Sequence, residues 1–364
     1  NINHNVPALR FPEFTGEWEK CKLSKVCSFF SGGTPPSSNK EYYNGNIPFI
    51  RSGELHNDET ELFITKEGLD NSAAKMVEVG DLLLALYGAT SGDIAISKIK
   101  GAINQAILCI RTKQNKKFVE SVWNKHVARL LQTYLQGGQG NLSADIVKNI
   151  PFYFTNIEEQ NKLARFISLL DQRIAAQNKI IEKLQSLIKG IAQNIVLRNK
   201  PNVRISQCLE CSSSTLQESD VWEYGAYPVY GANGVVGFLD NYNTSNEAIY
   251  IIKDGSGVGA VSYVAGKCSA TGTLNILQAK KGFSLRYLYY LLNIFNFEPY
   301  KTGMAIPHIY FKDYGKAQIF CPSYSEQLKY AKFLATIDDK LLTEQNVLIN
   351  LSLQKQYLLR QMFI

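Results

Sequence analysis

The 364-residue sequence lacks the features that mark several large classes of protein. No apolar run approaches the roughly 18 residues of a transmembrane helix, and no secretory hydrophobic segment stands near the start. The seven cysteines are an odd number scattered along the chain, and the four histidines have no metal-ligand spacing. We therefore expect a cytoplasmic protein with reduced thiols and no membrane segment.

Sequence signatures of catalysis are also missing. The chain has no P-loop, no Glu-x-Lys triplet of the common metal-dependent nuclease core, no Asn-Pro-Pro-Tyr type loop, and no H-E-x-x-H or G-x-S-x-G motif. Cys208 and Cys211 have C-x-x-C spacing, but no second pair completes a zinc site. Residues 255–260 (GSGVGA) resemble a dinucleotide fingerprint, yet a strand-like segment follows where a helix is required. We expect a non-catalytic binding protein without metal.

The composition fits a folded chain of two or three domains. Hydrophobic residues make up 45% of the sequence and charged residues 20%, which excludes a disordered protein. Lys and Arg number 39 against 32 Asp and Glu, and the resulting net charge of +7 permits a polyanionic partner without requiring one.

The sequence repeats itself once. Residues 159–167 (EQNKLARFI) match residues 326–334 (EQLKYAKFL), an offset of 167 positions, and Gly88 and Gly92 match Gly255 and Gly259 at the same offset. Nearer the start the offset drifts, because Pro48 pairs best with Pro228, 180 positions later. The pattern predicts two copies of one unit, each a globular module followed by a long helix.

Both helices carry a narrow apolar seam with a period of 3.5 residues, which is typical of a left-handed coiled coil. Gln177 and Glu344 interrupt the two seams at the same heptad step, and Lys355 interrupts the second again. Two readings are open: each helix packs on its own module, or the two helices pair with each other. The seam residues are Leu163, Ile167, Leu170, Ile174, Ile181, Leu184 and Ile188 in the first helix, and Leu334, Ile337, Leu341, Leu348, Leu351 and Leu358 in the second.

The modules are expected to be mostly β. Apolar runs at 81–86 and 248–252 end in glycine-rich turns, return strands follow at 94–96 and 261–264, and each module has room for one helix, at 118–134 and 285–297. We predict an α+β fold with two β-rich modules, separated by an antiparallel coiled coil of two long helices and related by an internal pseudo-two-fold axis. The expected bounds are a first module at 1–155, a first helix at 156–200, a second module at 201–322 and a second helix at 323–364.

Several short motifs resemble those of the specificity subunit of type I restriction–modification enzymes. The resemblance lies in their order along the chain and in the duplication of some of them. They are residues 6–14 (VPALRFPEF) leading into Trp18, 31–35 (SGGTP), 47–53 (IPFIRSG), 137–142 (GGQGNL) and 227–234 (YPVYGANG), with the repeated helix starts at 159 and 326.

This resemblance implies that the two modules are target-recognition domains, each reading one half of a bipartite, asymmetric site in double-stranded DNA, with a spacer set by the helices. It also implies a non-catalytic subunit that holds no cofactor of its own. Two methylation subunits, which carry S-adenosylmethionine, would dock on it, and restriction subunits using ATP would join the full complex.

The loops supply the candidate DNA-binding residues, because amide, hydroxyl and basic groups bond base edges and phosphates. We expect the two half-sites to differ, since the loops differ. Candidate base-reading residues are Arg51, Gln139 and Asn141 in the first module, and Tyr230, Asn233 and Met304 in the second. Candidate phosphate contacts are Lys40, Lys98, Lys253, Lys267 and Lys301, and Thr34, Ser52 and Ser91 are further loop candidates.

Two other functions stay open at this point. The first is a non-catalytic scaffold that binds only proteins and has a coiled-coil stalk. The second is a carbohydrate-active β domain with an unrecognised site. A steep loss of duplex binding as salt rises would separate DNA binding from both, because each phosphate contact releases counterions.

Overall fold

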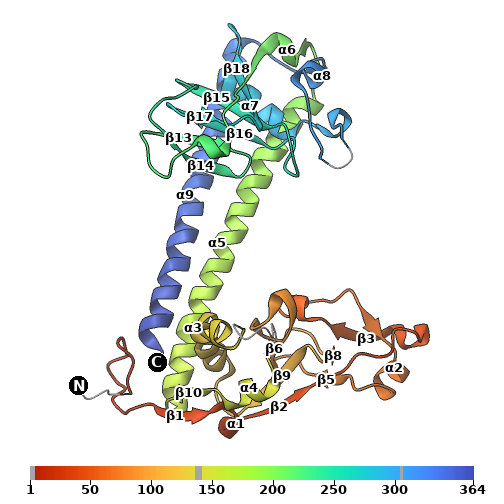
Figure 1. Ribbon diagram of the computed structural model, residues 1–364, viewed down its shortest axis with the longest axis vertical. Coiled ribbons are helices and arrows are strands. Elements are labelled where there is room, and N and C mark those ends of the chain that lie inside the picture. The colour runs from red at the N-terminus through yellow and green to blue at the C-terminus, as the bar shows by residue number, and fades with distance from the viewer. Residues whose placement is uncertain (1–4, 136–141, 304–305) are drawn as a thin grey trace. The chain divides into compact units, whose positions relative to one another are not determined.

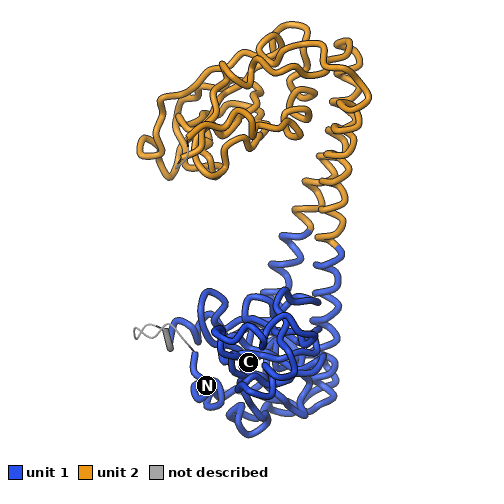
Figure 2. Tube along the Cα trace, turned by 90° about the vertical axis from the view of Figure 1, so that its right-hand side faces the viewer, with its two compact units in different colours: residues 1–176, 348–364 blue, residues 177–347 orange. Residues whose placement is uncertain are grey.

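A computed structural model describes residues 5–135, 142–303 and 306–364. The chain divides into two compact units, coloured separately in Figure 2: unit 1 comprises residues 1–176 and 348–364, and unit 2 comprises residues 177–347. Each unit therefore combines one β-rich module with a stretch of both long helices. Within the described residues, none of the helices has the length and apolar character needed to span a membrane.

The two long helices form where the repeat predicted them. Helix α5 runs from Ile157 to Leu197 and helix α9 from Tyr324 to Met362. Unit 1 contains the start of α5 and the end of α9, whereas unit 2 contains the end of α5 and the start of α9. In each unit the two stretches lie side by side and antiparallel (Figures 1 and 2).

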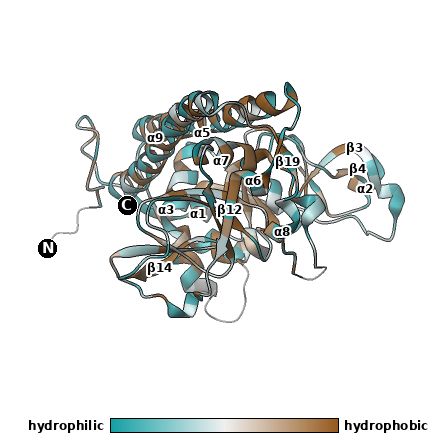
Figure 3. Ribbon diagram, turned by 90° about the horizontal axis from the view of Figure 1, so that it is seen from above, coloured by the Kyte–Doolittle hydropathy of each residue, from teal (hydrophilic) through white to brown (hydrophobic). Residues whose placement is uncertain are grey.

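The predicted seam is the covered face of both helices. Every seam residue is buried or half-buried, while hydrophilic stretches alternate with hydrophobic ones along both helices (Figure 3). In unit 2 the Gln177 side-chain amide donates to the Glu344 backbone carbonyl at 3.0 Å and also to its carboxylate. In unit 1 the other interruption, Lys355, reaches Asp171 at 2.6 Å. The polar steps of the seam thus pair with partners on the opposite helix, and the antiparallel pairing is confirmed.

The helix ends also pack on the modules, so the alternative reading holds in part. In unit 1, Leu163 and Ile167 join a core with Trp18, Trp123 and residues of α9. In unit 2, Ile195 joins the module core with Leu288. Each long helix therefore packs against the other helix along one stretch and against a β-rich core at its end. Both kinds of packing need apolar residues, so the seam is apolar along most of its length.

The centre of each module is a four-stranded antiparallel sheet with the same strand order in both copies. In unit 1 the order is β2 (Cys27–Ser31), β9 (Ile107–Thr112), β6 (Leu82–Ala85) and β7 (Ile94–Ile96). In unit 2 it is β12 (Leu209–Ser213), β18 (Leu274–Ala279), β15 (Glu247–Ile252) and β16 (Val261–Ala265).

The two sheets share their register as well as their order. Leu82 lies opposite Ile96 and Ile110 in unit 1, and Ile249 lies opposite Tyr263 and Leu277 in unit 2. Each of these positions in unit 2 follows its counterpart by 167 residues. The repeat read from the helices therefore extends through the sheet.

Both faces of each central sheet are covered, which explains the continuous apolar runs. In unit 1, Leu82 and Leu84 face the core that includes helix α3 (Lys116–Leu135), whereas Leu83 and Ala85 face a second cluster with Ile50. In unit 2, Ile249 and Ile251 pack with helix α7 (Leu285–Ile294), whereas Ala248 and Tyr250 pack on the other side.

A smaller sheet lies beside each central one. In unit 1 its order is β4 (Phe63–Ile64), β3 (Tyr43–Ile50), β8 (Gly101–Ile103) and β5 (Lys75–Val77), and in unit 2 it is β14 (Gly234–Leu239), β13 (Tyr227–Gly231) and β17 (Ser269–Ala270). Phe49 pairs in parallel with Ala102, and Val229 with Ser269. The first members of these pairs differ by 180 positions and the second members by 167, so unit 1 has 13 more residues between the two strands.

Short elements complete the modules. Two-stranded ribbons join β1 (Glu19–Lys22) to β10 (Pro151–Phe154) and β11 (Val203–Arg204) to β19 (Gln318–Ile319). The short helices are α1 (Leu23–Val26), α2 (Lys66–Asp70), α4 (Ala144–Asn149), α6 (Ile205–Cys208) and α8 (Phe311–Tyr314). Helix α7 ends three residues before the predicted Phe297, because Phe295 turns out of the helix and a 3₁₀ turn begins at Glu298, next to Pro299.

The glycine-rich connections are tight turns that join the central strands, as predicted. Gly92 donates to the Ala85 carbonyl at 2.8 Å, and Gly259 donates to the Ile252 carbonyl at 2.9 Å. Both glycines have positive φ, 87° and 91°. Strand β16 follows the second turn, so the rejection of a dinucleotide fingerprint at 255–260 is confirmed.

We expect Gly92→Ala to destabilise the protein by about 1–3 kcal/mol, because a side chain at positive φ is strained. A Cβ there would also lie 2.8 Å from Val127 Cγ2. Gly190→Ala is the matched control, since nothing lies within 4 Å of a Cβ at this position inside α5. It should stabilise by about 0.5–1 kcal/mol. Chemical denaturation measures both, and equal effects of the two substitutions would contradict the analysis of this turn.

Candidate nucleic-acid interface

Arg51 stands at the end of β3 and is tied to a carboxylate from the loop that follows. Its Nη2 donates to Glu54 Oε1 at 2.8 Å and to Glu61 Oε2 at 2.9 Å. Glu54 is only 7% exposed and also accepts from the Arg51 backbone N–H at 3.0 Å and from Thr60 Oγ1 at 2.9 Å. The carboxylate of Glu54 therefore fixes both ends of the 51–61 loop.

The charges in this cluster reinforce each other. Burial alone would raise the pKa of the Glu54 carboxyl, but the hydrogen bonds from Arg51, Thr60 and the Glu61 backbone outweigh it and lower the pKa to about 2. The same bonds from Glu54 and Glu61 raise the pKa of Arg51. Both bonds of the guanidinium use Nη2, so Nε and Nη1 are further hydrogen-bond donors of this side chain. The paired Arg51 is a pre-positioned donor.

Three other predicted residues of unit 1 lie around the same loop. Ser52 begins the 3₁₀ turn at 52–54, and Lys98 donates to the His56 carbonyl at 3.0 Å. His56 in turn contacts Asp93 at 2.9 Å, just after the turn that contains Ser91. The structure therefore brings Arg51, Ser52, Ser91 and Lys98 into one neighbourhood.

Thr34 and Lys40 lie on the segment that links β2 to β3. Both are exposed, and Thr34 Oγ1 donates to the Gln105 side chain at 2.8 Å. Lys40 begins a 3₁₀ turn that Asn39 caps. Gln139 and Asn141 lie outside the described residues, so their role as base-reading residues stays a prediction.

The candidates of unit 2 cluster less than those of unit 1. Asn233 is exposed in the turn between β13 and β14. Tyr230 is half-buried, its ring centroid lies 5.9 Å from that of Tyr250, and burial raises its pKa. Its ring therefore belongs in part to the core, where it packs against the cluster that contains Tyr250.

The lysines of unit 2 have diverse surroundings. Lys267 Nζ lies 4.9 Å from the ring centroid of Tyr242, and Lys301 pairs with Glu298 at 2.5 Å. Lys253 is half-buried at the end of β15, where its carbonyl accepts from the Ile309 backbone N–H at 2.9 Å. Met304 lies outside the described residues.

Sequence reasoning missed two features of these surfaces. The first is Glu54, because a single acidic residue in a loop gives no sign that it will be buried. The second is the pair Trp222 and Tyr224, which are 56% and 79% exposed. Trp222 is held by two backbone hydrogen bonds to Phe238 of β14, at 3.0 and 2.8 Å. Two large aromatic residues close to the 227–234 motif were the available signal.

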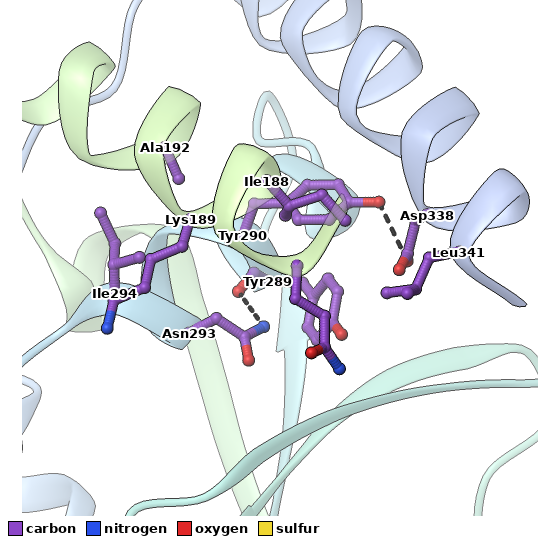
Figure 4. Close-up of a pocket in the computed structure, with 10 residues that line it drawn as sticks. Ile188, Lys189, Ala192, Tyr289, Tyr290, Asn293, Ile294, Asp338 and Leu341 are labelled. Atoms are coloured by element: carbon purple, nitrogen blue, oxygen red, sulfur yellow. Dashed lines mark hydrogen bonds between the residues drawn. The ribbon is translucent and has the colours of Figure 1, made fainter. Parts of the chain in front are cut away.

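A hollow of about 300 Å³ lies in unit 2 where α7 meets the long helices (Figure 4). Tyr290 donates to the Asp338 carboxylate at 3.2 Å, and Arg286 lies 3.5 Å from the same carboxylate. Ile188, Ala192 and Leu341 supply apolar walls. A carboxylate that already has two partners beside apolar walls suits packing by a protein side chain.

The cysteines of the C-x-x-C motif do not gather metal ligands. Cys208 is buried and its sulfur lies 3.8 Å from that of Cys321, rather than beside Cys211. Among the described residues, no group of three or more His, Cys, Asp or Glu side chains is placed to hold a metal ion.

The two-copy organisation has a counterpart among known protein families. The family model described as "Type I restriction modification DNA specificity domain" matches residues 15–186 and 202–351, which is one match to each copy of the repeat. The chain belongs to this family. The resemblance inferred from the short motifs is thereby confirmed.

Individual relatives are distant. The MjaVIII specificity subunit of Methanocaldococcus jannaschii is 24% identical over 51% of this chain and 43% of its own length, and the MjaIX subunit is 27% identical over 46% and 42%. This chain thus spans less than half the length of these two relatives. The EcoprrI specificity subunit of Escherichia coli is 20% identical over 92% of this chain and 90% of its own.

Solved structures share the fold. The S subunit of a type I restriction–modification system from M. genitalium is 18% identical, covers 99% of both chains and gives a TM-score of 0.67. A chain from a structural study of the assembly of a type I R-M system is 15% identical over 94% of this chain and 96% of its own, with a TM-score of 0.54.

We expect Glu54→Gln to weaken the acid sensitivity of the protein. The folded pKa of about 2 lies below the ordinary 4.5, so Glu54 stabilises the fold above pH 4.5 and this contribution is lost as the pH falls toward 2. The variant should be less stable by about 1–3 kcal/mol at pH 7, with the difference shrinking toward pH 2.

Denaturant midpoints across this pH range measure the effect. Glu61→Gln is the matched control, because Glu61 bonds the same Arg51 but its side chain is 87% exposed, and it should change little. A gap between wild type and Glu54→Gln that stays constant with pH would contradict the assignment.

Proposed function

We propose that this chain is the sequence-specific DNA-binding subunit of a type I restriction–modification complex and reads a bipartite, asymmetric site. The observation that carries the proposal is the duplication: two modules with the same sheet register but different loops, each in a unit with antiparallel stretches of both long helices. The family model matches both copies. One module would read each half-site, and the helix pair would set the spacer.

The differences between the modules support two different half-sites. Arg51, with its buried partner Glu54, occupies the position that Gly231 takes in unit 2, and unit 1 has 13 more residues between β3 and β8 than unit 2 has between β13 and β17. Arginine is the commonest reader of guanine in the major groove, and glycine presents no side chain. At this position unit 1 would therefore present a guanidinium group to DNA, whereas unit 2 would present only backbone.

The proposed partners follow from the helix faces that stay uncovered. Large apolar residues on the outer faces of α5 and α9 are between 43% and 59% exposed, as expected of surfaces that bind other proteins. They are Leu169, Ile180, Leu187, Phe333, Leu342, Ile349, Leu353 and Tyr357. Exposed Arg165, Arg173 and Lys183 accompany them.

Because the helices are duplicated, we propose two quasi-equivalent docking sites, hence two methylation subunits per chain. In this proposal S-adenosylmethionine stays with the methylation subunits and ATP with the restriction subunits. The chain itself would be a non-catalytic, cytoplasmic component without a cofactor.

The two other functions are less well supported. A carbohydrate-active β domain and a scaffold that binds protein only would both leave the duplicated family match unexplained. The net charge of +7 and the lysines of the loops also favour a polyanion.

The test of the function is deletion of this chain from its source cell followed by mapping of methylated bases in the genome. A bipartite methylated motif should vanish on deletion and return when the chain is restored. As a control, restoring the chain with the loop 51–61 replaced by glycine and serine should change or abolish only the half-site read by unit 1. An unchanged methylation map after deletion would refute the proposal.

We expect Arg51→Ala and Lys98→Ala to weaken DNA binding in different ways. Losing Arg51 should cost roughly 1–3 kcal/mol and relax one base position, whereas losing Lys98 should weaken all sequences and reduce the salt slope by about one. Binding of the chain with its methylation subunit to single-base variants of the site, across salt concentrations, measures both. Uniform weakening by Arg51→Ala would remove it from the base-reading residues.

A further inference from the structure

The segment before β1 fastens the start of α5 in unit 1. Arg10 donates from Nε and Nη2 to the two carboxylate oxygens of Glu159, both at 2.7 Å. Phe11 meets the ring of Phe166 edge-on, with centroids 6.0 Å apart. Lys162 lies 4.5 Å from the Phe11 centroid and also pairs with Glu13. Three residues of α5 thus form a receptor for an Arg-Phe-x-Glu segment.

The same receptor residues recur in unit 2. The counterparts of Glu159, Lys162 and Phe166, each 167 positions later, are Glu326, Lys329 and Phe333. All three residue types are unchanged, although this stretch of α9 has replaced Asn161, Leu163 and Arg165 by Leu328, Tyr330 and Lys332. The three receptor residues are therefore kept, as are Gln327 and Ala331, in a helix start whose other positions have changed.

The environment of the two copies differs sharply. Glu159 is fully buried under Arg10, and Phe166 is half-buried. In unit 2, by contrast, Glu326 and Lys329 are exposed, and Phe333 is 55% exposed. The Glu326 carboxylate accepts from the hydroxyl and backbone N–H of Ser323, which leaves lone pairs for a further donor.

A hollow lies next to the bare receptor. In unit 1 the Leu9 backbone N–H donates to the Gln361 carbonyl at 2.9 Å, which places the segment against the end of α9. The counterpart of Gln361 is Asn194, and Asn194 lines a hollow of about 230 Å³ in unit 2 with Ile191, Ile195 and Tyr330. The space beside the helices that residues 9–13 occupy in unit 1 is thus a hollow at the corresponding position of unit 2. Arg198 also lines this hollow and adds a positive charge to it.

From this comparison we infer that the surface formed by Glu326, Lys329, Phe333 and the hollow at Asn194 binds a segment of a partner protein. The occupied copy in unit 1 defines the chemistry of that segment: an arginine for Glu326, an aromatic residue directly after it for Phe333, and an acidic residue for Lys329. Arginine–carboxylate pairing of this two-pronged kind is both strong and geometrically selective.

A partner fits this surface better than a second copy of the chain. The segment at residues 9–13 of each copy is already engaged by its own Glu159 and Phe166. To reach another copy it would leave a buried ion pair in which Glu159 is fully covered, and breaking such a pair is costly. A segment from a different protein has no such contact to give up.

The test uses the full chain and a synthetic peptide of residues 5–15 (NVPALRFPEFT) as the probe, labelled for fluorescence anisotropy. We expect saturable binding that Phe333→Ala and Glu326→Arg each weaken about tenfold or more, the effect of losing a charge-assisted or aromatic anchor. Peptide carrying Arg10→Glu should bind Glu326→Arg better than it binds wild type. Asn346→Ala is the matched control, because Asn346 is exposed on the same helix and in the same unit, and it should leave binding unchanged.

A photo-crosslinker in place of Phe11 of the peptide locates the site. Crosslinks within residues 326–333 support the inference. Crosslinks only within residues 159–166, or no saturable binding by wild type, would overturn it. A chain that self-associates in sedimentation, and loses that association in both Arg10→Ala and Phe333→Ala, would assign the surface to a second copy and overturn the partner.

Discussion

The pairing of two helices that lie far apart in the sequence is the constraint on which both units depend. Each unit takes one end of α5 and the opposite end of α9, so unit 1 is complete only when residues 348–364 have joined residues 1–176. The apolar seam drives this association, and the bond from Gln177 to Glu344 opposes any shift in register, because a slipped pair would leave the buried Gln177 amide without this partner. The β-rich modules are then held on a helix pair whose alignment is decided by side chains outside them.

Comparison of the two modules shows that the central sheets are constant and that the loops vary. The central sheets repeat strand order, register and the hydrogen bonds of the glycine turns at Gly92 and Gly259. The loops beside the smaller sheets differ in length, charge and aromatic content, from the Arg51–Glu54 pair of unit 1 to the exposed Trp222 of unit 2. A buried sheet tolerates few changes because its packing is dense, whereas exposed loops are free to diverge. This division suits the proposed reading of two different half-sites by two modules that share one fold.

Periodic and repeated features could be predicted from the sequence, and isolated ones could not. The seam from Leu163 to Leu358, the strands around the glycine turns and the antiparallel pairing all rest on patterns of many residues. The burial of Glu54, the half-buried ring of Tyr230 and the early end of α7 depend on contacts between single side chains distant in sequence, or on one local turn. The Arg10–Glu159 pair is of the same kind: its two residues lie 149 positions apart, and neither alone signals the other. Which loop residues touch bases is decided at this finer scale, so those assignments stay predictions.

The 13 additional residues of unit 1 have an evolutionary implication. They fall between two stretches of strand whose parallel pairing is the same in both copies, and in unit 1 this interval also contains β5, which pairs with β8. Under the proposed function, a lineage could therefore lengthen, shorten or exchange this one interval and alter the half-site that unit 1 reads, while the parallel pairing of the two strands is kept.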